Sequence, residues 1–387
     1  MKRRPISAIL RSPTLRRGLP WAALFLAGAA YGGAAVRYGL FPYPDLQWQF
    51  HRLQRARQPM PVARKADLSL MTVATPADVE RRRRQLVRLI WASDALPSRQ
   101  PDSVETGIRD PRFATLPNLA RTDRLHVRMD FGLDSRILHF HPARANGVLV
   151  LVHDGHAQAT GLVKMVARLL ERGYSVAAFT MPLYGDNARP AVRAGQLGRI
   201  VLDNHEKLRL VRPAAGLTAK YLIEPVPVVL NRLAPSYRSV AMVGLSGGGW
   251  TTTLAAALDP RIGLSFPVAG TSPPDIASPG AWHDFEQSDP ALYVHVSYLD
   301  LYLLGAAGAG RGQLQILNEF DPCCFSGRAA LSYRAAVAAR ARALGGHYNL
   351  LIDNSHDQHQ ISDWAADRIL AALAAGSSPA AGAASGR

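Results

Sequence analysis

Residues 244–248 read Gly-Leu-Ser-Gly-Gly, a Gly-x-Ser-x-Gly motif whose flanking sequence restricts what the chain can fold into. The apolar run 240–243 predicts a buried strand, and residues 251–258 predict a helix. A serine on such a sharp strand-to-helix turn has its hydroxyl pushed away from the backbone, and the glycines remove Cβ atoms that would clash. Ser246 is therefore the candidate nucleophile, and a purely structural glycine-rich turn is the alternative.

Apolar runs alternate with helix-like segments from about residue 123 to residue 374. The run 147–152 is continuously apolar, which is typical of a central parallel strand. An antiparallel hairpin is expected at 126–141, before this run. Further strands are predicted at 174–180, 262–268, 312–318 and 348–352, and helices at 162–171, 328–344 and 362–374. This order predicts an α/β fold with a mostly parallel central sheet and helices on both faces.

The sequence divides into four regions. They are a basic N-terminus with a membrane anchor or signal (1–40), a peripheral region (41–122), the α/β domain (123–375) and a low-complexity tail (376–387). The peripheral region contains one clear helix, 76–91, in which Arg81 to Arg84 are expected to form an exposed turn. Residues 97–117 are expected to be a surface connection, and residues 270–302 are expected to be irregular.

Residues 19–36 carry no charged side chain, and six basic residues precede them. A run of this length is at the short end of what crosses a bilayer, and the distribution of basic residues predicts a cytoplasmic N-terminus. We therefore expect a membrane anchor with the catalytic domain exported to the periplasmic or extracytoplasmic side. The alternatives are a secreted protein, cleaved near 27–29, and a buried helix.

The net charge of +16 does not by itself indicate a nucleic-acid partner, because no basic stripe interleaved with aromatic residues accompanies it. The two cysteines, Cys323 and Cys324, are adjacent, so long-range disulfides do not hold the fold together, and both are expected to be small packing residues. His139 and His141 share one strand face but have no third ligand nearby in the sequence. A half-exposed strand face is therefore expected there, and no metal.

Three further groups accompany the serine motif: His-Asp-Gly-His at 153–156, Asp321 after a late strand, and His356 and His359 after the last strand. Their order along the chain resembles that of the α/β-hydrolase superfamily, in its serine esterase and lipase branch. The resemblance covers residues 123–374, about two thirds of the chain. It implies Asp321 as the triad acid, with Glu319 as the alternative, and His359 as the base, with His356 as the alternative.

The resemblance also implies an oxyanion site formed by backbone N–H groups of Gly247, Asp154 and Gly155. Family members commonly have glycine where Asp154 stands, so the Asp154 carboxylate is expected to point away from the developing negative charge. Trp250 and His153 are candidate substrate-binding residues. No metal or other cofactor is implied.

The expected activity is that of a serine hydrolase, which cleaves a carboxylic ester through an acyl-enzyme on Ser246. The substrate would be a small-molecule or lipid-like ester. Two alternatives use the same sequence features. One is a catalytically silent hydrolase fold that serves as a binding or scaffold protein at the membrane, and the other is an acyltransferase with the same triad.

Overall fold

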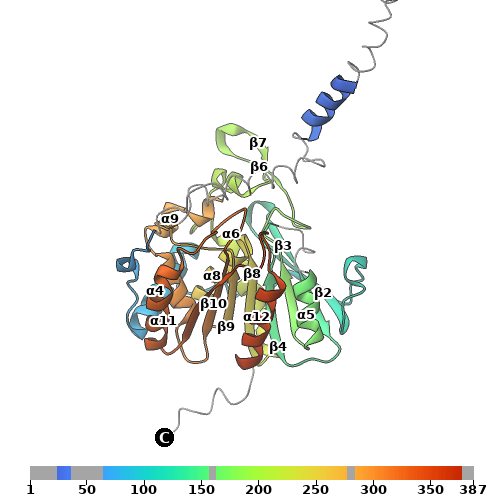
Figure 1. Ribbon diagram of the computed structural model, residues 1–387. Helices are drawn as coiled ribbons and strands as arrows, with labels where there is room; N and C mark the ends of the chain where they lie inside the picture. The colour runs from blue at the N-terminus through green and yellow to red at the C-terminus, as the bar shows by residue number, and fades with distance from the viewer. Residues whose placement is uncertain (1–23, 36–63, 157–162, 277–283, 377–387) are drawn as a thin grey trace, which may run out of the picture. The chain divides into compact units, whose positions relative to one another are not determined.

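The computed structural model describes residues 24–35, 64–156, 163–276 and 284–376 (Figure 1). The chain forms two compact units, residues 1–62 and 63–387. In the first unit, residues 24–35 are helical, and the side chains of Leu24, Phe25 and Tyr31 are exposed. Among the described residues, no helix is both long enough and apolar enough to cross a bilayer. The anchor predicted at 19–36 lies partly outside those residues.

A nine-stranded sheet organises the second unit. Its strands lie in the order β1-β2-β3-β5-β4-β8-β9-β10-β11, parallel from β5 to β11 and antiparallel from β1 to β5. The strands are β1 (Ser103–Glu105), β2 (Leu119–Arg128), β3 (Asp134–Pro142), β4 (Val148–His153), β5 (Ser175–Phe179), β8 (Ser239–Leu245), β9 (Ile262–Val268), β10 (Gly312–Asn318) and β11 (His347–Asp353). The predicted α/β class and mostly parallel sheet are confirmed.

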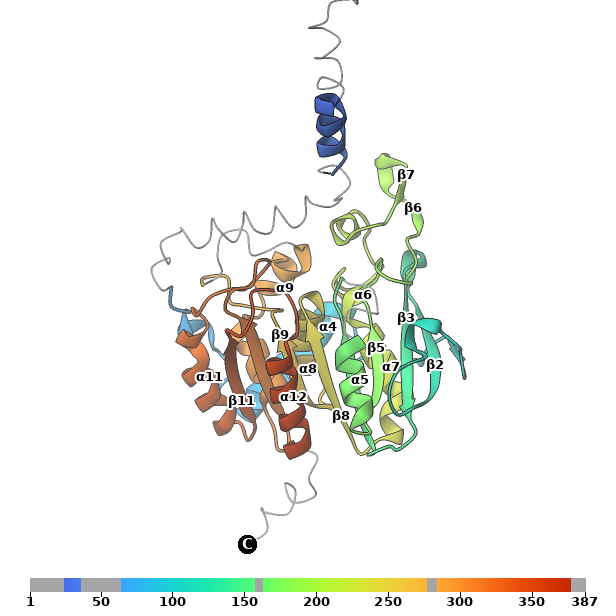
Figure 2. The same cartoon turned by 45° about the vertical axis from the view of Figure 1, so that its right-hand side comes forward.

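Helices cover both faces of this sheet. The α-helices are α4 (Pro76–Trp91), α5 (Val163–Glu171), α6 (Lys220–Ile223), α7 (Pro225–Leu233), α8 (Gly247–Leu258), α9 (Pro290–Tyr293), α10 (Tyr298–Ala306), α11 (Leu331–Ala343) and α12 (Asp363–Gly376). The views in Figures 1 and 2 place α5 and α12 together on one face, where they share a hydrophobic core. The other face is covered by α4, α7, α8, α10 and α11.

The burial of β4 shows why a continuously apolar run belongs in the middle of the sheet. Val150 and Val152 point into the core under α5 and α12, whereas Leu149 and Leu151 point into the core under α7 and α8. Side chains alternate between the two faces of a strand, so a strand covered on both faces needs apolar residues at every position. The sequence pattern of 147–152 therefore fixes β4 as a central strand.

Helix α4 belongs to the second unit and packs in its main core. The side chain of Thr75 accepts a hydrogen bond from the backbone N–H of Asp78, and the Asp78 carboxylate accepts one from the backbone N–H of Thr75, which forms a capping box. The apolar face of α4, including Leu86 and Ile90, is buried in the core shared with α8 and α10. Just before α4, backbone N–H groups of Thr72 and Val73 donate to the buried carboxylate of Asp300.

The prediction of an exposed turn at Arg81 to Arg84 is wrong for Arg83, which is only 8% exposed. Its guanidinium donates to the carbonyl oxygen of Ala257, at the C-terminal end of α8, and to that of Leu304, near the end of α10. The last carbonyl groups of a helix have no partner within the helix and carry partial negative charge, so they accept a buried guanidinium well.

Two other expectations differ from the structure. The expected surface connection at 97–117 contains the short edge strand β1, whose three side chains are all exposed, so no apolar alternation marks it in the sequence. The segment expected to be irregular at 270–302 ends in α10, a helix that is buried along its whole length. Because α10 is buried on all sides, it has no amphipathic pattern from which a helix could be predicted.

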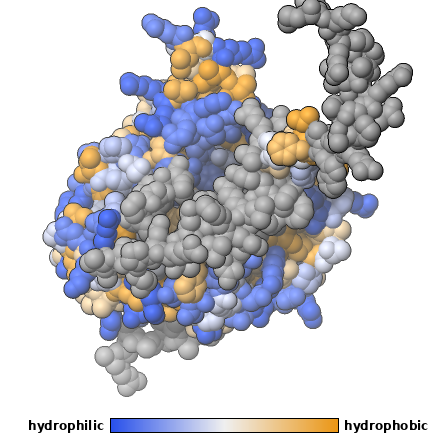
Figure 3. Space-filling view, turned by 45° about the horizontal axis from the view of Figure 1, so that its top comes forward, coloured by the Kyte–Doolittle hydropathy of each residue, from blue (hydrophilic) through white to orange (hydrophobic). Residues whose placement is uncertain are grey.

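The excursion between β5 and β8 carries a separate two-stranded hairpin, β6 (Ala191–Arg193) and β7 (Arg199–Val201), followed by the 3-10 helix η5 (His205–Leu210). The hairpin projects from the second unit in Figures 1 and 2. Apolar and hydrophilic surfaces lie side by side on the projecting part in Figure 3. The exposed residues Leu197 and Val201 contribute the apolar part, beside Arg193 and Arg199.

Candidate active site

Ser246 occupies the sharp turn between β8 and α8. Its backbone has φ 58° and ψ −127°, a conformation that residues with a side chain rarely adopt. The backbone N–H of Ser246 donates to the carbonyl oxygen of Val268 at the end of β9, 3.0 Å away, and this bond holds the turn on the neighbouring strand. The predicted strand, turn and helix around the serine are all present.

The glycines of the motif allow this turn to pack closely. A Cβ atom on Gly244 would lie 2.1 Å from the carbonyl oxygen of Gly248, and a Cβ atom on Gly248 would lie 2.1 Å from that of His153. Both distances are far below van der Waals contact. The turn therefore requires glycine at both positions so that α8 can start directly against β8 and the end of β4.

Asp321 follows β10 and is fully buried. Its Oδ1 atom accepts hydrogen bonds from the backbone N–H groups of Cys323 (2.8 Å) and Cys324 (3.2 Å). Its Oδ2 atom lies 2.7 Å from Nδ1 of His359. The carboxylate is thus fixed on one side by its own loop and presents its other oxygen to an imidazole ring.

His359 lies in the loop between β11 and α12. Its Nε2 atom is buried and has no hydrogen-bond partner among the described residues. With Nδ1 directed to Asp321, the ring has the arrangement of a general base, in which one nitrogen is oriented by a carboxylate and the other is left for a reacting group.

His356, the alternative base, is held by a different carboxylate. Its Nε2 atom lies 3.3 Å from Oδ2 of Asp353, and its Nδ1 atom accepts a hydrogen bond from the backbone N–H of Gln358. Asp353 also accepts hydrogen bonds from the hydroxyl groups of Ser355 and Ser362. The group around Asp353 therefore spans the loop that carries His359.

Glu319, the alternative acid, pairs at 3.8 Å with the guanidinium of Arg328. The structure thus directs Asp321, and not Glu319, to an imidazole ring. Asn318, for which no sequence pattern predicted a role, lies beside the pair of Asp321 and His359. Its amide donates to Oδ2 of Asp321 (3.2 Å) and to the carbonyl oxygen of Gln360 (3.0 Å), so it ties the acid to the loop of the base.

The loop after β4 differs from the expected oxyanion site. The N–H of Asp154 donates to the carbonyl oxygen of Phe179, and the N–H of Gly155 donates to Nδ1 of His153. Both groups are therefore engaged within the protein in this structure, and their expected role as oxyanion donors stays a prediction. Gly247 is the first residue of α8, where backbone N–H groups have no partner inside the helix. Its N–H is therefore still a candidate donor to an oxyanion.

The side chain of Asp154 is buried, and burial raises its pKa to about 8, against a smaller opposing effect of Thr180. A carboxyl group with this pKa is largely protonated at neutral pH. A neutral carboxyl group at this position would not repel an oxyanion that formed nearby.

Neither expected substrate-binding side chain is exposed. Trp250 is fully buried in the first turn of α8, and its indole N–H donates to the Tyr293 hydroxyl at 2.7 Å. His153 is also buried, stacks on Phe179 and accepts the Gly155 N–H, and burial lowers its pKa to about 3. Both residues support the elbow from within the core, which corrects the expectation that they contact a substrate.

The cysteines also differ from the expected pair of buried packing residues. Cys323 and Cys324 form a disulfide with each other, and Cys323 is exposed. The two histidines on β3, His139 and His141, each have a polar partner from another segment. His141 Nε2 lies 2.8 Å from Asp123, and His139 Nε2 lies 2.9 Å from the Tyr237 hydroxyl.

No protein-family model matches the sequence, and no curated protein matches it. Solved structures do match in fold. Acetyl xylan esterase 1 from Thermoanaerobacterium sp. JW/SL YS485 is 14% identical, with a TM-score of 0.52 over 81% of this chain and 100% of that one. A glucuronoyl esterase from Solibacter usitatus is 12% identical, with a TM-score of 0.54 over 83% and 99%. A methylesterase is 13% identical, with a TM-score of 0.51 over 81% and 69%. At such identities the likeness concerns the fold, and the chain has the α/β-hydrolase fold that its sequence predicted.

Proposed function

We propose that this protein is a serine hydrolase that cleaves a carboxylic ester, with Ser246 as nucleophile, His359 as general base and Asp321 as the orienting acid. One observation carries the proposal. The buried Nε2 atom of His359 has no hydrogen-bond partner in the part of the chain that the structure describes, while its Nδ1 atom lies 2.7 Å from Asp321, in the same unit as the constrained turn at Ser246.

In the proposed reaction, Nε2 of His359 takes the proton of the Ser246 hydroxyl while Oγ attacks the carbonyl carbon of the ester. The tetrahedral intermediate collapses, the carbon–oxygen bond to the alcohol breaks, and His359 returns the proton to the leaving alkoxide. Water then gives its proton to His359 and attacks the acyl-enzyme. His359 passes this proton to Oγ of Ser246 as the acid leaves, which restores the hydroxyl group and the neutral imidazole. Asp321 stabilises the imidazolium form of His359 during both acylation and deacylation.

Negative charge on the carbonyl oxygen would develop near the start of α8. The N–H of Gly247 is oriented there by the helix, and the N-terminal end of a helix carries partial positive charge. We propose this N–H as one donor of the oxyanion site.

The proposed substrate class rests on this machinery and on the names of proteins with the same fold. The three structures described above are named as an acetyl xylan esterase, a glucuronoyl esterase and a methylesterase. These names support a carboxylic ester of a small molecule as the substrate class.

The test is hydrolysis of p-nitrophenyl acetate and butyrate by the full chain, together with labelling by a fluorophosphonate. We expect Ser246→Ala to reduce turnover to the background rate and to abolish labelling, because the attacking oxygen is lost. Ser93→Ala, which removes an exposed serine hydroxyl, serves as the matched control and should keep both. A wild-type protein that neither turns over these esters nor labels at Ser246 would favour a silent binding or scaffold protein.

We further propose that residues 19–36 anchor the protein in a membrane with the catalytic domain exported. The uncharged run and the six basic residues before it support this orientation. Fusing alkaline phosphatase, which is active only after export, to the C-terminus tests the orientation. An inactive fusion, with an active cytoplasmic reporter at the same position, would contradict it.

A further inference from the structure

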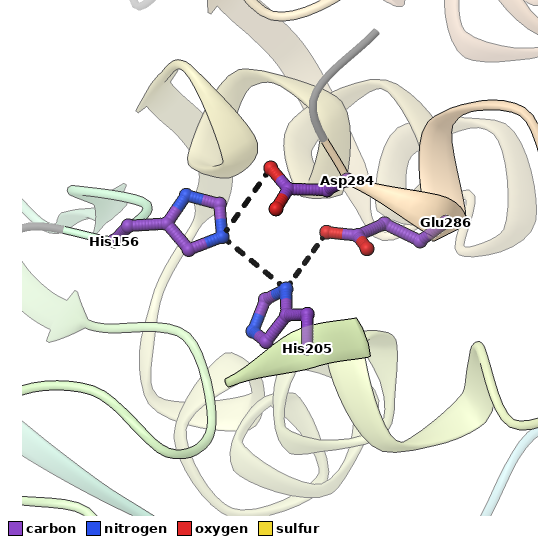
Figure 4. Close-up of side chains that lie close together, drawn as sticks. All are labelled: His156, His205, Asp284 and Glu286. Atoms are coloured by element: carbon purple, nitrogen blue, oxygen red, sulfur yellow. Dashed lines mark hydrogen bonds and ion pairs between the residues drawn. The ribbon is translucent and has the colours of Figure 1, made fainter. Parts of the chain in front are cut away.

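Four side chains with metal-binding atoms lie close together in the second unit (Figure 4). His156 follows β4, His205 opens η5, and Asp284 and Glu286 lie at the 3-10 helix η7 (Phe285–Gln287). They come from three segments that are far apart in sequence. One nitrogen or carboxylate oxygen from each residue lies within 4.8 Å of those of the other three.

The separations between these atoms match those of ligands around one metal ion. His156 Nε2 lies 3.2 Å from His205 Nδ1, His205 Nδ1 lies 2.9 Å from Glu286 Oε1, and His156 Nε2 lies 3.6 Å from Asp284 Oδ2. Ligand atoms about 2.0–2.1 Å from a tetrahedral zinc ion are about 3.3 Å from one another. Three of the six separations are therefore close to those in a tetrahedral shell, and the remaining three are at most 4.8 Å.

The burial of the cluster gives a second, independent indication. The side chains of His205 and Glu286 are 1% and 0% exposed, and the second carboxylate oxygen of Glu286, Oε2, is buried without a hydrogen-bond partner among the described residues. Burying a carboxylate oxygen without a partner costs free energy. A divalent cation between the four side chains would offset this cost and balance the charge of the two carboxylates.

A second cluster of this unit, with two histidines on β3, lacks these properties. In the group of Asp123, His139 and His141, the Arg121 guanidinium pairs with the Asp123 carboxylate and contacts His141 Nε2 at 3.2 Å. A cation already belongs to that cluster, which leaves no charge for a metal to balance. It therefore serves as the internal comparison.

We propose that His156, His205, Asp284 and Glu286 bind one divalent transition-metal ion of the zinc type. The ion would join the loop after β4 to η5 and η7. It would also fix the His156 ring, which already lies close to the nucleophile turn: a Cβ atom on Gly247 would be only 2.8 Å from Cε1 of His156. The site borders the proposed active site but is defined by other residues, so it does not depend on the proposed activity.

The test measures metal binding without substrate. The full chain is purified, stripped with a chelator and titrated with zinc chloride by calorimetry, and cobalt(II) is added separately to record its absorption spectrum. We expect about one zinc ion per chain, a raised melting temperature and the intense visible bands of tetrahedral cobalt. Asp284→Asn and Glu286→Gln should each weaken zinc binding about 10- to 100-fold or more, whereas the control His141→Gln should not.

Asp284 is partly exposed, so Asp284→Asn is expected to fold even if the buried Glu286→Gln does not, and circular dichroism checks both. Absence of zinc binding to the wild-type chain would overturn the proposal. So would equal zinc affinity of wild type and a folded Asp284→Asn variant. Zinc binding that is lost in His141→Gln instead would assign the metal to the comparison cluster and would also overturn it.

Discussion

Nδ1 of His359 and Oδ2 of Asp321 lie 2.7 Å apart, although 38 positions separate the two residues in the sequence. The parallel strands β10 and β11 bring them together, because each residue lies in the loop that follows the carboxyl end of its strand. Neighbouring parallel strands present these ends at the same edge of the sheet, which is where α/β proteins place their sites.

Asp321→Asn should lower kcat for ester hydrolysis about 10³- to 10⁴-fold with little change in KM, because an amide no longer stabilises the imidazolium form of His359. Steady-state kinetics on p-nitrophenyl butyrate measure this change. Glu319→Gln, which alters the carboxylate paired with Arg328, is the matched control and should stay near wild-type kcat. The opposite ranking of the two variants would assign the acid to Glu319.

His359→Gln should abolish turnover, whereas His356→Gln should retain most of it. The two residues share one loop, but only His359 contacts Asp321, while His356 contacts Asp353. Both variants are compared at equal concentration after a check of their folding. Loss of activity in His356→Gln together with retention in His359→Gln would reverse the proposed roles.

Gly248→Ala should destabilise the protein by more than about 3 kcal/mol, because its Cβ would overlap the backbone carbonyl of His153 and neither backbone can move cheaply. Gly263→Ala offers a control within β9, since its Cβ would have no neighbour closer than 3.6 Å. That variant should stay within about 1 kcal/mol of wild type. Urea unfolding followed by circular dichroism gives both values.

The stability of the protein should fall as the pH drops from about 6.5 toward 3, and His139 should contribute to this fall. Burial and the neighbouring His141 lower the pKa of His139 to about 3 in the folded chain, against 6.5 for the ordinary group. Between these values the unfolded chain binds a proton that the folded chain excludes. Stability from this group is therefore present above pH 6.5 and is lost on acidification, by at most about 1.4 kcal/mol per pH unit.

His139→Gln should show a shallower decline over the same range, because glutamine does not titrate. Asp123, Arg121, His141 and the hydroxyl of Tyr237 surround the ring and remain in the variant. The free energy of unfolding is measured in urea at intervals between pH 3 and 8. Parallel pH profiles for wild type and variant would contradict the assignment.

Arg83→Met should lower the free energy of unfolding by about 1–3 kcal/mol, because the carbonyl oxygen of Ala257 loses its side-chain donor, whereas that of Leu304 keeps a hydrogen bond from the Arg311 guanidinium. Arg84→Met, in the exposed part of the same helix, should have almost no effect. Thermal and urea unfolding compare the two. Equal effects would mean that burial of Arg83 contributes no stability.

The parts of the fold that could be predicted are those in which a local pattern decides the structure. The strand β10 (Gly312–Asn318) and the helix α4 were predicted at their observed bounds, because an apolar run and a capping signal define their ends. The turn at Ser246 was predicted because glycines flank the serine between an apolar run and a helix-forming run. In each case the information lies within a few residues of the element.

The features that could not be predicted depend on contacts between distant segments. Arg83 is buried because two helix ends converge on it, and Asn318 acts on Asp321 because a later loop supplies its other partner. His205 and Glu286 face each other from segments that are 81 positions apart. Which polar residues contact each other depends on the order of the strands in the sheet, and a single sequence does not determine that order.

The burial of α4 also bears on where this protein can be shortened. A fragment beginning at Asp123 would keep Ser246, Asp321 and His359 but would lose Arg83, the apolar face of α4 and the backbone donors to Asp300. It would expose the ends of two helices to water and leave a cavity lined by α8 and α10. The smallest fragment that folds and stays soluble on expression is therefore expected to begin before Asp67. This is well upstream of Asp123, where the resemblance to hydrolases begins.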